Sequence, residues 1–332
     1  MPAGCYYGIE VVKSHYEKVT VIAPARLHMG FIDLSGALGR HFGSIGVGLN
    51  DINTHLTVTP GADLVVNGAC AERARKSVKR LCKLLAVPEQ INITISQAIP
   101  EHIGLGSGTQ LSLALGAALN AFYDLGLSVR DIAKLTDRGA RSGIGIGVFE
   151  QGGLVVDGGR GSDTVTPPLL SRMPIPDHWR FILAFDSRGQ GLHGEQEISA
   201  FKQLPPFPRQ EAERLAYLLL MQALPALAEQ NLRLFGNVIT ELQEAVGRHF
   251  APVQGGIFTS PEVAAAMKWL QQQGAVAIGQ TSWGPTGFCA IDDPEVATDL
   301  LNELKCRFTS EHLSFMVVSA RNQGADVISQ NV

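Results

Sequence analysis

The stretch that decides the fold is E-H-I-G-L-G-S-G-T-Q, from Glu101 to Gln110. It follows the run I-N-I-T-I-S at residues 91–96, in which isoleucine alternates with polar residues. That period of two predicts a strand with one buried face. The run L-S-L-A-L-G-A-A-L-N-A-F at residues 111–122 carries no charge and predicts a buried helix. The local order is therefore strand, glycine-rich loop and helix.

A glycine-rich loop that enters a helix has the chemistry to bind phosphate. Gly104, Gly106 and Gly108 allow positive φ and a close approach of the backbone to a ligand. We expect Ser107 or Thr109 to cap the helix. The free N–H groups of the first turn and the helix dipole then attract an anion. The alternative is a glycine-rich turn that packs before a core helix and binds no ligand. The loop matches neither the dinucleotide fingerprint nor the P-loop.

Composition is that of an ordinary compact soluble enzyme. The chain has 332 residues, 45% hydrophobic and 17% charged, which predicts about two domains and argues against disorder. Its net charge of −4 argues against nucleic-acid binding. The five cysteines are scattered without a C-x-x-C, so a reducing cytoplasm fits. No apolar run approaches the roughly 18 residues needed to span a membrane, so we expect no membrane partner.

The first half of the chain begins with a predicted strand at residues 18–23. We interpret the polar segment that follows, with Arg26, His28 and Asp33, as lying between strands. Residues 71–86 predict a helix with six basic residues and one acid, which we interpret as a solvated face.

A cluster of prolines from Pro167 to Pro176 predicts a domain boundary near residue 165, giving domains 1–165 and 166–332. In the second half we expect two helices at residues 210–249, broken near Pro225. The alternation of helices and strands that follows predicts a sheet with helices on one side, and an α+β fold class.

Three segments resemble the motifs of the GHMP kinase superfamily of small-molecule kinases. P-A-R-L-H-M-G at residues 24–30 resembles the first motif, and residues 100–110 resemble the phosphate-binding motif. Q-T-S-W-G-P-T-G at residues 280–287 resembles the C-terminal glycine motif. The resemblance covers most of the chain. It implies a two-domain GHMP-kinase-like fold, with an N-terminal domain similar to ribosomal protein S5 domain 2 and a ferredoxin-like C-terminal domain.

Two departures from the kinase pattern count against kinase chemistry. Kinases of this superfamily usually read G-L-G-S-S-A, whereas this loop reads G-L-G-S-G-T-Q. Several also carry S-G-x-D, whose aspartate is the catalytic base. The matching segment here is Ser142 to Gly145, with glycine at the aspartate position. A glycine cannot accept the proton of a substrate hydroxyl.

The variants instead resemble the β-ribofuranosylaminobenzene 5′-phosphate synthase family. Its patterns match residues Ala25 to Arg40, His102 to Gln110, and Ser282 to Thr286. Enzymes of this family join 4-aminobenzoate, or 4-hydroxybenzoate, to phosphoribosyl pyrophosphate and release CO2 and pyrophosphate, an early step toward methanopterin. The resemblance implies a pentosyltransferase. The alternatives are an ATP-dependent kinase of the same superfamily and a non-catalytic protein that binds a metabolite.

The candidate site residues fall into four groups. The predicted phosphate or pyrophosphate site comprises Gly104, Leu105, Gly106, Ser107, Gly108, Thr109, Gln110 and Arg40. The predicted catalytic residues are Arg26, His28 and Asp33. The predicted substrate-binding residues are His102, Arg138, Arg141, Gln280, Ser282, Trp283 and Thr286. Asp33 and Glu101 are the candidates for Mg2+, with Glu150 as a further carboxylate.

Each group has a simpler interpretation. Arg26, His28 and Arg40 could be ordinary surface charges, and the carboxylates could form salt bridges or caps. Trp283 could stack on an aromatic substrate or only pack. We expect a homodimer, because the homodimer is the commonest oligomeric state of soluble proteins that form oligomers.

Overall fold

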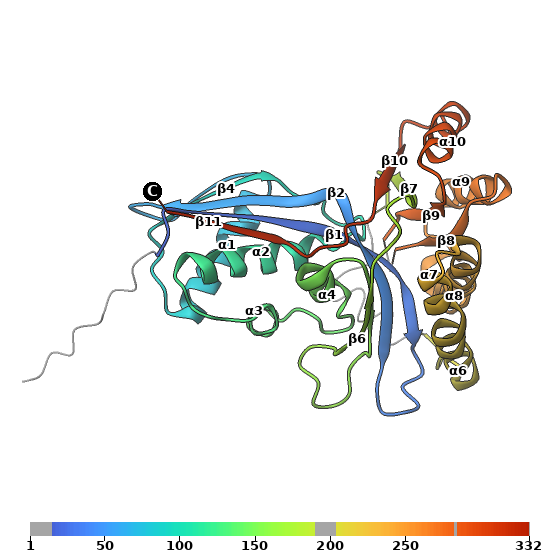
Figure 1. Cartoon of the computed structure of the whole chain (residues 1–332), viewed down its shortest axis with the longest axis horizontal. Helices are drawn as coiled ribbons and strands as arrows, with labels where there is room; N and C mark the ends of the chain where they lie inside the picture. The colour runs from blue at the N-terminus through green and yellow to red at the C-terminus, as the bar shows by residue number, and fades with distance from the viewer. Residues whose placement is uncertain (1–14, 190–203, 282–283, 332) are drawn as a thin grey trace, which may run out of the picture.

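The computed structural model describes residues 15–189, 204–281 and 284–331 and has two sheets, each with its own helices (Figure 1). The first sheet has seven strands in the order β11-β1-β2-β4-β3, with β5 paired to β2 and β6 to β5. Its strands are β1 (Lys18–Asp33), β2 (Phe42–Pro60), β3 (Val65–Gly68), β4 (Ile91–Gln97), β5 (Leu154–Asp157), β6 (Leu169–Met173) and β11 (Asp326–Gln330). Its helices are α1 (Ala71–Leu85), α2 (Ser107–Phe122), α3 (Val129–Leu135) and α4 (Ile144–Gln151). The fold class is therefore α+β, as the resemblance implies.

Strand β1 differs from the sequence prediction. It does not end at Ala23 but continues to Asp33, with register shifts against β2 between Pro24 and Arg26 and again between His28 and Gly30. The polar segment therefore lies within a strand and not between strands. It was missed because polar side chains at Arg26 and Asp33 interrupt the apolar pattern.

At the first register shift, between Pro24 and Arg26, the two faces of strand β1 exchange. The odd-numbered residues from Val19 to Ala23 pack in a cluster with α1 and α2. The odd-numbered residues from Ala25 to Phe31 pack instead against the second sheet and its helices. Since strand residues alternate between faces, the shift exchanges the two faces. Arg26 and His28 consequently face the side of the sheet that carries α2 and α4.

The second sheet has four antiparallel strands in the order β10-β7-β9-β8. They are β7 (Arg180–Asp186), β8 (Val276–Gln280), β9 (Gly287–Ile291) and β10 (Leu313–Ser319). Counted along the chain this order is 4-1-3-2, which is the ferredoxin-like arrangement. The helices of this half are α6 (Arg209–Leu218), α7 (Leu224–Ala228), α8 (Leu232–Gln254), α9 (Pro261–Gln272) and α10 (Pro294–Arg307), with a π-helical turn η1 (Leu219–Ala223) before α7.

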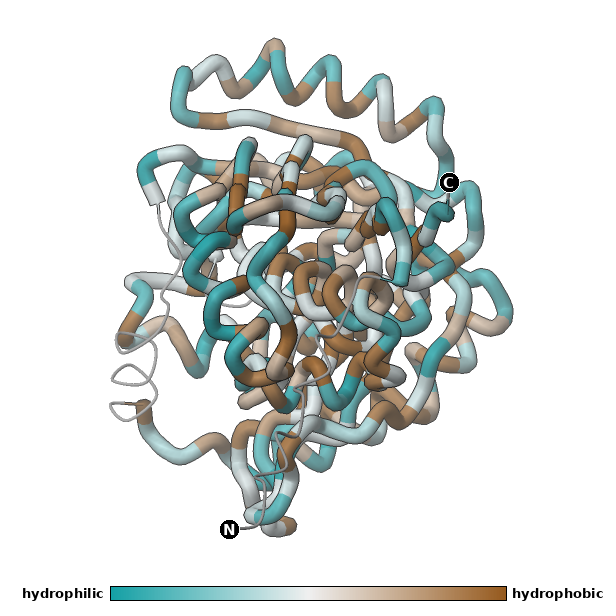
Figure 2. Tube along the Cα trace, turned by 90° about the vertical axis from the view of Figure 1, so that its left-hand side faces the viewer, coloured by the Kyte–Doolittle hydropathy of each residue, from teal (hydrophilic) through white to brown (hydrophobic). Residues whose placement is uncertain are grey.

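Helices cover both faces of the second sheet, so the prediction of helices on one side is wrong. Ile182 and Ala184 pack against α9 and α10. Phe181 and Leu183 pack against α6, α7, α8 and the first sheet. The run R-F-I-L-A-F is apolar on both faces, which is the pattern of a strand buried on both sides. Figure 2 shows the hydrophobic residues gathered in the interior and hydrophilic ones along the outer turns.

The helical region of the second half breaks at a different place from the one predicted. Pro225 lies in the first turn of α7, where a proline is tolerated, and the chain leaves the helix only at Glu229 to Asn231. Asn231 then caps α8 by accepting a hydrogen bond from the backbone of Leu234.

The sheets are not divided at residue 165. Strands β6 and β11 both follow that position in the sequence and both belong to the seven-stranded sheet. The division into domains 1–165 and 166–332 stays a prediction. None of the helices among the described residues is long and apolar enough to span a bilayer.

Candidate active site

The glycine loop between β4 and α2 has an alternating backbone. His102, Gly104 and Gly106 have φ of 62°, 81° and 83°, and the residues between them are not left-handed. Such alternation turns successive N–H groups toward one side, as in backbone anion nests. Gly108, by contrast, lies inside α2 and has no positive φ. The N-cap is Gly106 with no side-chain cap bond, so the predicted cap from Ser107 or Thr109 is wrong.

The carbonyl groups of residues 103 to 106 in the loop all accept hydrogen bonds from the protein. Thr286 Oγ1 donates to the carbonyl of residue 103 at 2.6 Å, and Thr281 Oγ1 donates to that of residue 104 at 2.7 Å. Arg26 donates from Nη1 to the carbonyl of residue 104 at 2.5 Å and from its backbone N–H to that of residue 105 at 3.1 Å. The carbonyl of Gly106 accepts from the N–H of Gln110 at 3.0 Å.

The loop's N–H groups are not used in the same way. Across the part of the chain that the structure describes, no N–H group from Ile103 to Thr109 donates to a protein acceptor. The protein thus binds the carbonyl groups of the loop, while the N–H groups at the start of α2 remain available to a ligand. This asymmetry is what binding of an anion requires.

The C-terminal glycine motif holds the loop in place. Thr281 and Thr286 are fully buried, and Gly284 lies so close that a Cβ there would be 2.7 Å from the Cα of Gly104. The two glycine motifs therefore pack backbone to backbone across the two halves of the chain. Thr286, predicted to bind substrate, is a positioning residue in this geometry. Ser282 and Trp283, also predicted to bind substrate, lie outside the described residues.

Three arginines surround the loop. A Cβ on Gly106 would be 2.9 Å from Arg26 Cγ, and a Cβ on Gly108 would be 2.6 Å from Arg73 Nη2 and 3.7 Å from Arg138 Nη1. Arg138 donates through Nε to Ser112 at 3.1 Å and has no carboxylate partner among the described residues. Burial and the charges of neighbouring arginines lower the pKa of Arg138. Arg138, predicted to bind substrate, lies near the loop, and its role stays a prediction; Arg73, which the sequence analysis assigned to a solvated face, also lies beside the loop.

The predicted metal ligands do not form one cluster. Glu101 pairs with Arg73 at 2.6 Å and lies at the start of the loop. Asp33 caps the β1–β2 turn by accepting from the N–H of Ser35 at 2.7 Å and its hydroxyl at 2.6 Å. It lies seven residues along β1 from Arg26, which is about 23 Å at ~3.3 Å per residue. Glu150 pairs with Arg130 at 3.3 Å. No three potential ligands gather among the described residues.

His28 is a buried neutral imidazole. Its side chain is 1% exposed, and Nδ1 accepts from the N–H of Gly30 at 3.2 Å. Nε2 therefore carries the proton and has no partner among the described residues. Burial, helped by the charge of Arg26, lowers the pKa of His28 well below its ordinary value of 6.5. This histidine stays uncharged in the folded protein at neutral pH.

A buried carboxylate that the sequence did not single out lies at the start of α4. Asp157 ends β5 and accepts from the N–H of Gly143 at 2.9 Å and from that of Gly159 at 2.8 Å. The hydroxyls of Ser44 and Ser142 donate to the same carboxylate. Burial raises the pKa of Asp157 despite these hydrogen bonds. A single aspartate at a strand end, L-V-V-D, gave no signal of its position beside α4.

The remaining predicted residues have structural contacts. Gln280 is buried, and its side chain bonds to the backbone of Thr259 at 2.9 Å and to Gln254 at 3.1 Å. Arg40 donates to the carbonyls of residues 158 and 159, both at 2.9 Å. His102 lies 3.8 Å from Glu101. Arg141 lines a separate cavity at the turn that connects β1 and β2.

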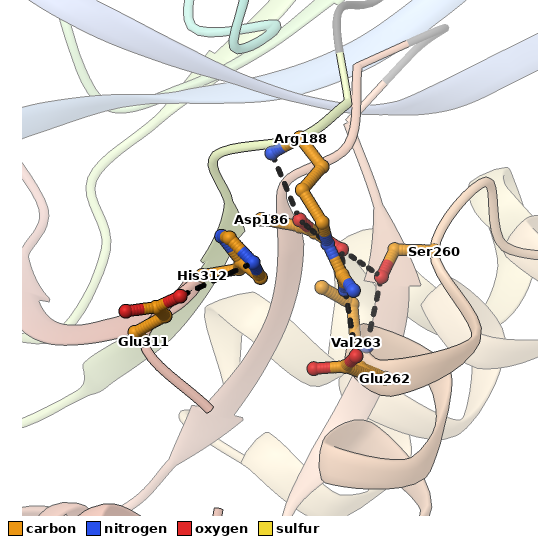
Figure 3. A network of polar contacts seen from close by, with 7 residues as sticks. All are labelled: Asp186, Arg188, Ser260, Glu262, Val263, Glu311 and His312. Atoms are coloured by element: carbon orange, nitrogen blue, oxygen red, sulfur yellow. Dashed lines mark hydrogen bonds and ion pairs between the residues drawn. The ribbon is translucent and has the colours of Figure 1, made fainter. Parts of the chain in front are cut away.

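A polar network closes the end of β7 near the second glycine motif (Figure 3). Arg188 bonds to Asp186 at 2.8 Å and to Glu262 at 2.8 Å, and Ser260 donates to Asp186 at 2.7 Å. The hydrogen bonds from Arg188 hold the pKa of Asp186 well below its usual range. Since every member has a partner of opposite charge or a donor, this network fixes β7 to α9.

Comparisons with known proteins agree with this geometry. Residues 69–152 match the GHMP kinases N terminal domain, and residues 223–310 match the GHMP kinases C terminal domain. A protein of Methanocaldococcus jannaschii named β-ribofuranosylphenol 5′-phosphate synthase is 33% identical over 91% of this chain and 97% of its own. The chain belongs to the β-ribofuranosylphenol 5′-phosphate synthase family. A synthase of the same name from Archaeoglobus fulgidus is 30% identical over 92% of this chain and 97% of its own.

The fold of this synthase family member also matches solved GHMP structures. Mevalonate diphosphate decarboxylase of Staphylococcus aureus superimposes with a TM-score of 0.66, at 17% identity, over 94% of this chain and 98% of its own. At that identity the match establishes the fold alone. The loop and its two flanking motifs therefore sit on a GHMP scaffold.

Proposed function

We propose that this chain is a pentosyltransferase that condenses 4-hydroxybenzoate or 4-aminobenzoate with phosphoribosyl pyrophosphate. The products are a C-riboside 5′-phosphate, CO2 and pyrophosphate, in a pathway toward tetrahydromethanopterin. Membership of the β-ribofuranosylphenol 5′-phosphate synthase family supports this reaction. The single structural observation that carries it is the glycine loop with unused N–H groups beside three arginines.

The loop suits a pyrophosphate leaving group. N–H groups at a helix start stabilise negative charge as it develops, and they need no rearrangement to do so. Arg138 and Arg73 add positive charge next to Gly108, where an anion on the loop would lie. Arg26 holds two carbonyls of the loop away from that anion. These groups together favour departure of pyrophosphate over its retention.

The chemical step balances without an added oxidant or proton donor. The bond between ribose C1 and the pyrophosphate oxygen breaks, and its electron pair leaves with pyrophosphate. The ring carbon that bears the carboxylate donates a π pair to C1 and forms the new C–C bond. Cleavage of the ring–carboxylate bond then returns a pair to the ring and releases CO2. The protein contributes placement of the two reactants and stabilisation of the leaving group.

Mg2+ fits this site as a companion of the substrate. The ion keeps several waters and needs only one or two carboxylates besides substrate phosphates. Glu101 offers such a carboxylate at the start of the loop, next to Arg73. Asp33 is too far along β1 to share that ion. When bound, the metal would neutralise charge on the leaving pyrophosphate.

Gly145 argues against phosphoryl transfer from ATP. It lies beside the loop, with its carbonyl accepting from Gln110 Nε2 at 2.8 Å, and it has no side chain to act as base. The buried carboxylate at the start of α4, Asp157, accepts hydrogen bonds from the N–H groups of Gly143 and Gly159 and from the Ser44 hydroxyl. The kinase alternative therefore lacks an aspartate at the position of the kinase catalytic base.

A paired turnover assay tests the proposal. One reaction contains carboxyl-labelled 4-hydroxybenzoate or 4-aminobenzoate, phosphoribosyl pyrophosphate and Mg2+, and labelled CO2 is counted. The other contains ATP with galactose, homoserine or mevalonate, and ADP is counted. We expect CO2 that depends on both substrates and does not require ATP. ADP formation without CO2 would overturn the proposal.

A further inference from the structure

Asp157 is a buried carboxylate that the proposed reaction does not use. It is the last residue of β5, its side chain is 1% exposed, and it lies at the start of α4. We propose that Asp157 is a positioning residue for the glycine loop and acts on it through the first turn of α4. The inference rests on the proposed function, in which the loop binds pyrophosphate, and it adds a residue that controls this binding from outside the site.

Both carboxylate oxygens of Asp157 accept hydrogen bonds. Oδ2 accepts from the N–H of Gly143 at 2.9 Å and from the hydroxyls of Ser44 and Ser142. Oδ1 accepts from the N–H of Gly159 at 2.8 Å. An ionised carboxylate has about four acceptor positions, so these four donors leave none for a proton. The network therefore suits the ionised form of Asp157, and it ties β2 and β5 to the start of α4.

Helix α4 depends on this carboxylate because its own sequence supplies no acidic cap. The N-cap is Gly143, without a side chain, and the first turn of α4 carries no acidic residue. Asp157 places a negative charge at this helix start, where the helix dipole favours an anion. The hydroxyl of Ser142, which donates to Asp157, accepts from the N–H of Ile144 at 3.2 Å. A residue of a different strand thus takes the part that an N-cap side chain usually has.

The first turn of α4 in turn contacts the glycine loop. Gly145, two residues after Gly143, accepts from Gln110 Nε2 at 2.8 Å. A Cβ on Gly145 would be 2.9 Å from the Cγ2 methyl of Thr109. Gln110 is fully buried, so its amide has little room to follow a displaced partner. Movement at the start of α4 is therefore passed to the start of α2, where the available N–H groups of the loop lie.

Protonation of Asp157 would disturb this arrangement. A proton on Oδ2 has to displace one of the three donors to that oxygen. Burial raises the pKa of Asp157 above its ordinary value of 3.8, so protonation begins at a less acidic pH than for an exposed aspartate. The charged and titratable side chains on the segments packed around Asp157 are Asp33, Arg40, His41, Arg141 and Arg160. We expect the affinity of the loop for pyrophosphate to fall as the pH drops through the pKa of Asp157.

Isothermal titration of the full chain with pyrophosphate and Mg2+ tests the inference. Asp157→Asn removes the charge and should weaken binding about tenfold or more, because the amide turns a donor toward groups that also donate. Ser44→Ala removes one donor and should weaken binding by a few-fold. Asp293→Asn is the matched control, because Asp293 accepts from two N–H groups at the start of α10, in the other half of the chain. The control should bind as the wild type does.

NMR of backbone amides gives a measurement that a purely structural role would not affect. We expect the signals of Gly143, Gly108 and Thr109 to share one titration step between pH 4.5 and 8. That step should be absent in Asp157→Asn. If these signals share no step, or if the shared step persists in Asp157→Asn, a different group such as Glu101, His102 or His41 governs the loop and the inference is overturned.

The outcomes separate this inference from the proposed function. A wild-type protein that binds no pyrophosphate would overturn the function, while the shared titration step would still support the role of Asp157. Wild-type affinity in Asp157→Asn would overturn the inference and leave the function standing. If Asp157→Asn does not fold, Ser44→Ala decides in its place, and an unchanged affinity in that variant would overturn the inference.

Discussion

The Cγ2 methyl of Thr109 lies against Gly145, only 2.9 Å from where a Cβ on that glycine would be. The contact joins the phosphate loop to the first turn of α4. Gln110 strengthens it by donating to the Gly145 carbonyl at 2.8 Å. A threonine at 109 and a side chain at 145 cannot both be accommodated without movement. The two departures from the kinase pattern, the G-T-Q loop and the glycine at position 145, are therefore in contact, and Thr109 occupies the space that a side chain at position 145 would need.

Gly145→Ala should displace the loop through this contact. Overpacking of this kind costs roughly 1–3 kcal/mol, and we expect weaker pyrophosphate binding by isothermal titration together with lower thermal stability. The double variant Thr109→Ser with Gly145→Ala removes the obstructing methyl and should recover most of both losses. Equal binding by wild type and the single variant would contradict the role of this contact.

Gly106→Ala should abolish pyrophosphate binding, because its φ is 83° and a Cβ would press on Arg26. Gly126→Ala is the matched control: its φ is 68°, but nothing lies within 4 Å of its Cβ position. Both variants should lose stability, by about 1–3 kcal/mol for the strained backbone. Only the first should lose ligand. If the two variants bind pyrophosphate alike, the loop does not hold the anion.

Arg138→Gln should weaken pyrophosphate binding by about 10- to 100-fold, since it removes a charge-assisted hydrogen bond. Arg80→Gln provides the control, because Arg80 is nearby but pairs with Asp137 at the surface. That change should alter affinity by at most a few-fold. Titrations at several salt concentrations should also show a smaller salt dependence for Arg138→Gln alone. A wild-type affinity in that variant would remove Arg138 from the site.

Thr286→Val should raise the KM for phosphoribosyl pyrophosphate, because it leaves the buried carbonyl of residue 103 without its donor. An unsatisfied buried acceptor costs about 1–3 kcal/mol. Thr286→Ser keeps the hydroxyl and should behave like the wild type. Steady-state kinetics and thermal unfolding measured together separate loop placement from general stability. Identical kinetics for the valine and serine variants would show that this clamp is dispensable.

The stability of the wild-type protein should fall as the pH drops below about 6.5, in part because of His28. Its pKa is lowered in the folded state, so the unfolded chain takes up a proton that the folded chain does not. One such group contributes a slope of up to about 1.4 kcal/mol per pH unit. Denaturant unfolding of His28→Gln between pH 5 and 7.5 should lack this component. An unchanged slope would show that His28 is protonated in the folded protein.

Much of the fold could be predicted from local patterns. The alternation at residues 91–96 gave β4, the uncharged run gave α2, and the basic run gave α1. The errors came where two patterns competed. Polar side chains within β1 resembled a loop, because the register shift that points Arg26 toward α2 has no mark in the sequence. Strand β7 is apolar on both faces, which indicates burial on both sides, but the alternation of helices and strands that follows it led to the prediction of helices on one side only.

The sequence by itself determined the glycine loop, its two flanking motifs and the family, because the loop and the motifs are short local patterns and the family resemblance rests on them. Only the tertiary structure decided which cations reach that loop. In the sequence, Arg73 is one of six basic residues on a predicted helix, and only the packing of α1 against α2 brings it to the loop. Asp157 is a single aspartate in the sequence, and only the position of β5 beside the start of α4 brings it to Gly143. The cavity with Phe42, Arg141 and His249 joins residues that are about a hundred positions apart from one to the next. Contacts of that separation depend on how the sheets and helices pack, and periodicity along the chain carries no record of it.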